Sequence, residues 1–242
     1  GSMEDPWADG STQKSVQVAE TVNKIIGQLL HSGKDQKPDG SKDFKDRFDI
    51  ACLGYGTTQG SAFSGTFVQD ELVSSGELFE EFGATMETVT PYVLPRFDRN
   101  GTDMYAAFEF AERIVRAWIG GIEHADSFPP MVIHLTDGEN GGADPTPVVE
   151  RIKALRTNDG EVLVWNLHIA SLDNANSVDS NVMFVESESD LRDVYARKLC
   201  VLSSRIPNSP KFEGYEGKYA FGYNLSVKNF VNMMRIGTIK AA

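Results

Sequence analysis

The sequence contains few cysteines. Only Cys52 and Cys200 occur among its 242 residues. Two cysteines cannot build the several disulfide bridges that support small secreted domains. Cys52 lies in an apolar, strand-like run and Cys200 at the end of a helix-like run, so we expect both to be reduced core residues. This expectation favours a reducing compartment, and we predict that the protein is cytoplasmic.

The sequence also lacks long apolar runs. No uninterrupted apolar stretch reaches the roughly 18 residues that span a bilayer. The chain does not open with the basic segment and apolar segment of a secretion signal. We therefore expect no membrane partner.

Basic residues are scarce relative to acidic ones. The chain has 23 Lys and Arg against 35 Asp and Glu, for a net charge of −12. Nucleic acids are bound by clustered Lys and Arg that neutralise phosphates, so we expect no nucleic-acid partner. Hydrophobic residues make up 40% of the chain, which is enough for a packed core.

Helical and strand-like patterns alternate along the chain. Short apolar runs at 48–54, 130–136 and 162–169 predict buried strands, and 63–68 is a candidate neighbouring strand. Apolar residues recur at helical spacing in four segments, which are 16–30, 104–119, 148–155 and 190–202. Strands that alternate with helices predict an α/β fold with a mostly parallel sheet and helices on both faces.

The segment after residue 202 differs in composition. It is rich in Pro, Gly, Tyr and Asn as far as Tyr223 and then carries a short helical pattern. We predict one domain over 1–202 and a C-terminal extension over 203–242 that packs on it.

Polar residues follow one predicted strand and precede one predicted helix. Asp137 follows the strand that ends at Thr136, and Thr102 opens a long helix. Ligands of open parallel sheets bind outside the carboxyl ends of the strands. A carboxylate and a hydroxyl there suit a hard cation such as Mg²⁺. From these residues alone, a turn at Asp137 and a helix cap at Thr102 is the simpler interpretation.

The motifs around these residues resemble the von Willebrand factor A family. Leu135-Thr-Asp-Gly138 follows an apolar strand, and Asn100-Gly-Thr-Asp103 precedes a helix. The family has a three-layer, Rossmann-like fold. Its metal site is built from three loops, which carry Asp-x-Ser-x-Ser, a Thr and an Asp. The resemblance covers roughly residues 1–202 and implies Asp137, Thr102 and Ser2 as metal ligands, with Ser2 as the last serine of the first loop.

The family's first strand and the leading Asp-x-Ser would lie upstream of Gly1. The resemblance therefore implies that a central strand is missing from this chain, which would leave an exposed strand edge or an alternative pairing such as a domain swap. One carboxylate and two hydroxyls would bind Mg²⁺ or another divalent cation weakly. We expect the metal site to be empty or poorly occupied.

The resemblance implies a binding module and not an enzyme. An acidic side chain of a protein partner would complete the metal coordination, with Glu139 and Asn140 at the rim. Segments of the C-terminal part, among them Phe221-Gly-Tyr-Asn224, resemble the ending of bacterial von Willebrand A proteins related to the tellurite-resistance group. Those proteins often accompany protein kinases and phosphatases, which implies a role in intracellular bacterial signalling or stress response.

Two alternatives remain open. The first is a metal-assisted hydrolase that uses the same acids, and a His134 or His168 open to the crevice would favour it. The second is a scaffold that does not use metal. Partner binding that survives the loss of Asp137 would favour the scaffold.

Overall fold

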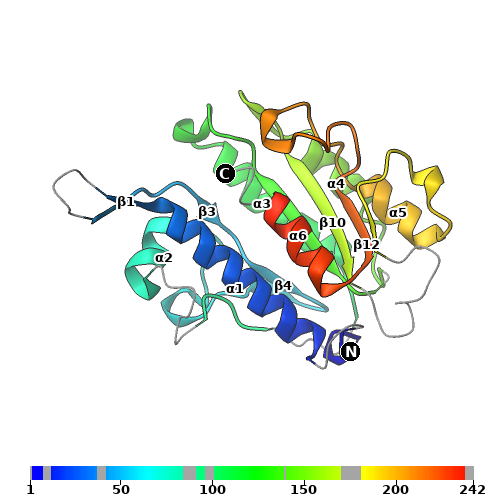
Figure 1. Cartoon of the computed structure of the whole chain (residues 1–242), viewed down its shortest axis with the longest axis horizontal. Coiled ribbons are helices and arrows are strands. Elements are labelled where there is room, and N and C mark those ends of the chain that lie inside the picture. Colours follow the sequence, from blue (N-terminus) through cyan, green and yellow to red (C-terminus); the bar gives the residue numbers. More distant parts are fainter. Residues whose placement is uncertain are drawn as a thin grey trace.

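The centre of the protein is a four-stranded mixed sheet (Figure 1). The computed structural model describes residues 2–7, 12–36, 42–83, 91–95, 101–138, 140–169 and 181–237. The strand order is β11-β12-β10-β7, in which β10 is parallel to β7 and to β12, and β11 is antiparallel to β12. The strands are β7 (Met131–Thr136), β10 (Leu163–Ile169), β11 (Val182–Met183) and β12 (Phe221–Leu225).

Helices cover both faces of this sheet. Every residue of β10 is buried, as expected for a parallel strand between two helical layers. Trp165 and Leu167 face a core that includes α1 and α6, and Val164 faces a core that includes α3, α4 and α5. The predicted α/β class is confirmed. The α-helices of the described ranges are α1 (Lys14–Gly33), α2 (Ser75–Phe82), α3 (Met104–Ile119), α4 (Thr146–Lys153), α5 (Val194–Leu202) and α6 (Val227–Gly237).

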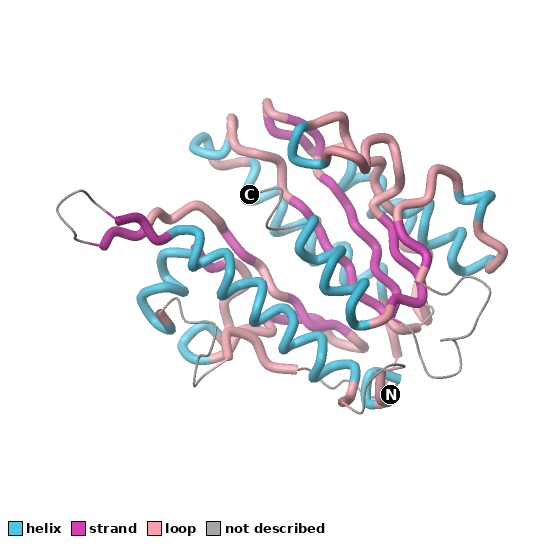
Figure 2. Tube along the Cα trace, viewed as in Figure 1, coloured by secondary structure: helices cyan, strands magenta, loops and turns pink. Residues whose placement is uncertain are grey.

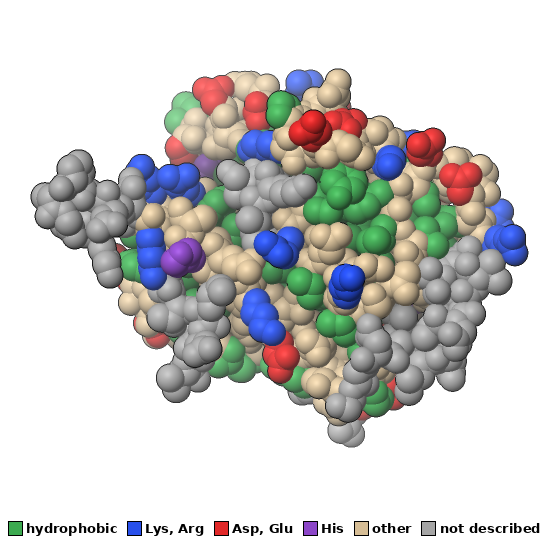
Figure 3. Space-filling model, in the orientation of Figure 1, with side chains coloured by type: hydrophobic (Ala, Val, Ile, Leu, Met, Phe, Trp, Pro, Cys, Tyr) green, Lys and Arg blue, Asp and Glu red, His purple; other side chains and the backbone are tan. Residues whose placement is uncertain are grey.

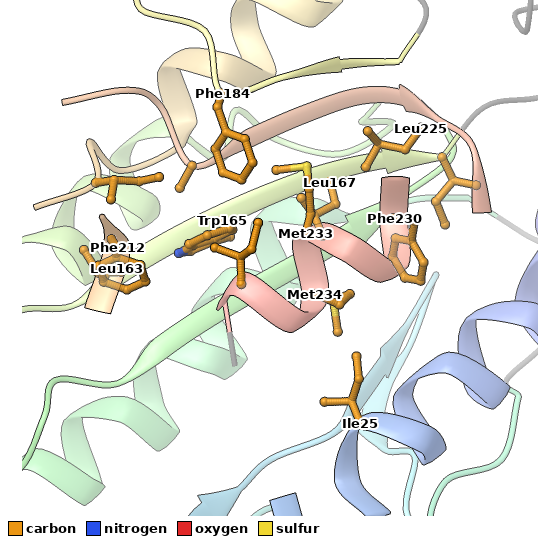
Figure 4. Close-up of a cluster of buried hydrophobic side chains, with 14 of the residues drawn as sticks. Ile25, Leu163, Trp165, Leu167, Phe184, Phe212, Leu225, Phe230, Met233 and Met234 are labelled. Atoms are coloured by element: carbon orange, nitrogen blue, oxygen red, sulfur yellow. The ribbon is translucent and has the colours of Figure 1, made fainter. Parts of the chain in front are cut away.

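The C-terminal part belongs to the centre of the sheet. β12 lies between β11 and β10, and Phe230 and Met233 of α6 are fully buried against β10 (Figure 4). At Gly222 a Cβ atom would lie 2.5 Å from the sulfur of Met233, so glycine allows α6 to approach β12 this closely. The boundary predicted at residue 202 therefore falls between two elements of one fold.

Short strands form a second group beside α1 (Figure 2). The run 48–54 was predicted as one buried strand, but it contributes to two short strands that pair with different partners. The segment 63–68 contains a 3₁₀ turn instead of a strand. Glycines at 54, 56 and 60 favour tight turns over a long strand. The short strands of this group are β1 (Lys34–Gln36), β2 (Lys42–Phe44), β3 (Asp49–Ile50), β4 (Leu53–Tyr55), β5 (Gln59–Ser61) and β6 (Val73–Ser74). Two other short strands, β8 (Arg156–Thr157) and β9 (Gly160–Glu161), pair with each other just before β10. The 3₁₀ helices are η1 (Ser2–Glu4), η2 (Gly65–Phe67), η3 (Ile122–His124), η4 (Glu188–Asp190) and η5 (Pro210–Phe212).

The strand β7 is paired on one side only within the described residues. Leu163 N donates to Pro130 O, so Pro130 directs its carbonyl toward β10. Because alternate residues of a strand direct their backbone groups to opposite sides, those of Met131, Ile133 and Leu135 point away from β10. There the hydroxyl of Tyr55, in β4, donates to Leu135 O at 3.2 Å. The open edge of β7 therefore faces the second group of strands.

The face that carries α1 and α6 shows how the described basic side chains are distributed. On this face, the basic side chains outside the grey areas are scattered and do not form one patch (Figure 3). In the described ranges, no helix is both long and apolar enough to cross a membrane.

Candidate functional site

Three segments meet at the carboxyl end of β7. Gly141 N donates to Thr102 O at 2.8 Å, and Met104 N donates to the side-chain oxygen of Asn140 at 3.1 Å. Lys14, the first residue of α1, places its Nζ 3.1 Å from Oδ2 of Asp137. The fold thus brings the segments of Thr102 and Asp137 together at the carboxyl ends of the parallel strands. We call this group of segments the strand-end site.

The start of α3 does not use Thr102 as its cap. The side chain of Asp103 accepts a hydrogen bond from Ala106 N at 3.0 Å and caps the helix. Thr102 is partly exposed, and its carbonyl accepts the bond from the loop after β7. Its hydroxyl is therefore not needed as the helix cap.

The structure describes less of the other predicted site residues. Ser2 lies in η1, which packs against α1, but its side chain is outside the described part. The backbone N–H of Lys14 donates to Asp5 O at 3.1 Å, which ties the segment after η1 to the start of α1. Glu139 lies outside the described residues, as does Asn100.

Sequence analysis missed Lys14. Its side chain is completely buried, and that of Asp137 is 7% exposed. A lysine in the first turn of a helix is unfavourable next to the positive end of the helix dipole. This unusual position is the one signal in the sequence that could have identified Lys14.

A chain of hydrogen bonds runs through the sheet below the site. The hydroxyl of Tyr55 lies 2.6 Å from Nε2 of His134, and Nδ1 of His134 lies 2.8 Å from Oδ1 of Asn166. The amide of Asn166 donates to Ser203 Oγ at 3.1 Å, next to the end of α5. Both ring nitrogens of His134 are therefore held inside the protein.

His168 lies near the carboxyl end of β10, and it is also buried. Its ring stacks on Tyr223 at 4.5 Å, and Asn224 N donates to its Nδ1 at 3.3 Å. Burial lowers the pKa of His168 to about 4, although the charge of Asp137 opposes this shift. The hydroxyl of Tyr195, whose ring also contacts His168, donates to Gly138 O and so fixes the turn after Asp137.

The burial of His134 predicts a pH-dependent stability. Burial lowers its pKa to about 4 from 6.5, so between these values the unfolded chain takes up a proton that the folded chain does not. The stabilisation is complete above about pH 6.5 and is lost as the pH falls toward 4, by about 3 kcal/mol. Urea unfolding at a series of pH values checks this. The His134→Gln variant should show a shallower dependence, and an equally steep dependence in both proteins would contradict the assignment.

The carboxylate of Asp137 is already paired with an ammonium in the described residues. Mg²⁺ would need to approach an oxygen of Asp137 to about 2.1 Å, but the Lys14 ammonium already lies against that carboxylate. Within the described ranges, no three His, Cys, Asp or Glu side chains are grouped so that they could hold a metal. The predicted Mg²⁺ site at Ser2, Thr102 and Asp137 stays a prediction.

Comparisons with known proteins do not place the chain in a family. No family model, no characterised protein and no solved structure matches it. The functional argument therefore depends on the geometry of the strand-end site and on the motifs that form it.

Proposed function

We propose that this protein is a protein-binding module related to the von Willebrand factor A class, and that it binds its partner at the strand-end site. The observation that carries the proposal is the joining of the Thr102 and Asp137 segments by the bonds from Gly141 N and Met104 N. These bonds fix two separate loops as one surface at the carboxyl ends of parallel strands, where ligands of such sheets bind.

Exposed loops form the surface of the strand-end site. Gly101 and residues 141–144 are exposed, whereas Lys14 is buried. Rigid scaffolds that present exposed loops are a common arrangement for recognition. The resemblance suggests an acidic group on the partner and a context of bacterial kinase and phosphatase signalling.

The hydrolase alternative lacks support from the histidines of the site. His134 and His168 are 6% and 3% exposed, and hydrogen bonds inside the protein hold them. Burial lowers the pKa of each to about 4, so both are neutral near pH 7. Neither imidazole opens to the crevice, where a general base would have to reach a substrate.

A surface variant tests the proposal. Ala143 is exposed in the loop after β7, so Ala143→Arg adds bulk and charge to the proposed surface without filling the core. A partner captured by crosslinking from extracts of the cells that make the protein should bind this variant at least about tenfold more weakly than wild type. Calorimetry or surface plasmon resonance with the purified partner gives the affinities.

The matched control is Ile122→Arg. Ile122 is 93% exposed in η3, before the start of β7 and therefore at the opposite end of the sheet. It should leave the affinity unchanged. Equal binding by wild type and Ala143→Arg, or a loss with Ile122→Arg only, would refute the proposed surface.

A further inference from the structure

The strand-end site already contains a buried positive charge. The Lys14 ammonium is completely buried and lies 3.1 Å from Asp137 Oδ2, although the two residues are 123 positions apart in the sequence. Burying an ammonium costs several kcal/mol unless an opposite charge compensates it. The first turn of α1 adds a further unfavourable contribution from the helix dipole. The carboxylate of Asp137 supplies an opposite charge at this position.

Two described polar groups near the pair are uncharged. His168 is uncharged near pH 7 because burial lowers its pKa. Burial also raises the pKa of Tyr55, so its hydroxyl keeps its proton. Asp193, which interacts electrostatically with His168, is the N-cap of α5 and accepts from Ala196 N. Lys14 is therefore a cation that directly balances Asp137.

A divalent ion and this ammonium would compete for the carboxylate of Asp137. Mg²⁺ binds carboxylate oxygens at about 2.0–2.1 Å and carries two positive charges. Placed on Asp137, it would lie within a few ångströms of the Lys14 Nζ in a buried environment, where like charges repel strongly. Lys14 has no exposed surface through which its charge could be solvated in place.

We propose that the ammonium of Lys14 is the permanent cation of the strand-end site and that this site functions without a divalent metal. The inference rests on the proposed function and refines it, because it removes metal from the requirements for partner binding. A direct consequence is that, once the Lys14 charge is removed, Mg²⁺ should bind at Asp137 and stabilise the protein.

The test measures the melting temperature with and without millimolar Mg²⁺, together with titration calorimetry of Mg²⁺. Wild type should show no Mg²⁺-dependent shift and no binding heat. Lys14→Met keeps most of the side-chain volume but removes the ammonium from the buried carboxylate, so Tm should fall by roughly 6–15 °C. Mg²⁺ should restore part of this loss. The matched control is Lys24→Met, an exposed lysine of the same helix, which should change neither Tm nor the response to Mg²⁺.

A double variant keeps the test decisive. Lys14→Met with Asp137→Asn removes both charges, so it should be more stable than Lys14→Met alone and should not respond to Mg²⁺. If Lys14→Met does not fold, a folded double variant still supports the pair. A Tm of wild type that rises with Mg²⁺, sub-millimolar Mg²⁺ binding by wild type, or a Lys14→Met protein as stable as wild type would each overturn the inference.

Partner binding in the presence of EDTA separates this inference from the proposed function. Binding that persists in EDTA supports both statements. Binding that requires Mg²⁺ overturns the role of Lys14 and leaves the binding surface intact. A surface that fails the Ala143→Arg test refutes the proposed function, while the melting experiment still decides which cation balances Asp137.

Discussion

A chain that ends at Leu202 is expected to lose the cooperative unfolding transition of the whole protein. Such a chain lacks β12, which pairs with β10 along one edge, and α6, which covers one face of the sheet. The buried rings of Phe221 and Phe230 would be lost with them. The remaining sheet would expose apolar surface and unpaired backbone groups that the remaining chain cannot cover. Scanning calorimetry and near-ultraviolet circular dichroism check this.

The same experiment has an internal control. A peptide of residues 203–242, added to the shortened chain, should restore part of the transition, because it supplies the missing strand and helix in trans. A sharp transition of the shortened chain alone would show that residues 1–202 form an independent domain, as the composition suggested.

Replacement of Trp7 by alanine is the point mutation expected to have the largest effect on stability. Trp7 has no exposed surface, its ring lies 5.2 Å from that of Phe230, and its Nε1 donates to Leu225 O at 2.9 Å. Removing it leaves a cavity and an unsatisfied carbonyl, at a cost of about 3–5 kcal/mol. Urea unfolding monitored by circular dichroism measures this cost.

Two further variants separate the loss of the hydrogen bond from the loss of the buried ring. Trp7→Phe keeps an aromatic ring but removes the donor to Leu225 O, so we expect a smaller loss of about 1–3 kcal/mol. Trp118→Ala removes a partly exposed indole that bonds the side chain of Asp49, and it should cost about 1 kcal/mol or less. Equal losses for Trp7→Ala and Trp118→Ala would contradict the placement of Trp7 in the core.

The sequence predicted the elements whose pattern is unambiguous. The apolar runs at 130–136 and 162–169 correspond to β7 and β10, and the helical spacing before Gly33 corresponds to α1. The prediction of 48–54 as one strand was wrong, because the first part of the run pairs with β6 and the last part pairs with β5. Strand pairing is set by contacts far apart in the sequence, so composition did not show that β12 is inserted beside β10.

The candidate site was predictable only in part. Asp137 and Thr102 were expected at one edge because each lies where a strand ends or a helix begins, and their segments do meet there. The pairing of Asp137 with Lys14 was not expected, because a lysine on an amphipathic helix ordinarily lies in solvent. Only the tertiary fold shows that the first turn of α1 points into the site.

The place of β12 in the sheet also has a consequence for the order of synthesis. Translation delivers β7 and β10 first, and the strand that covers the other edge of β10 is made about 50 residues later. At about 5–20 residues per second, the ribosome needs several seconds for this interval. During that time the edge of β10 that later pairs with β12 has unpaired backbone groups, on a strand that is mostly apolar, so newly made chains are most exposed to aggregation before Leu225 emerges. Slower translation or faster production of this protein should therefore increase its dependence on chaperones.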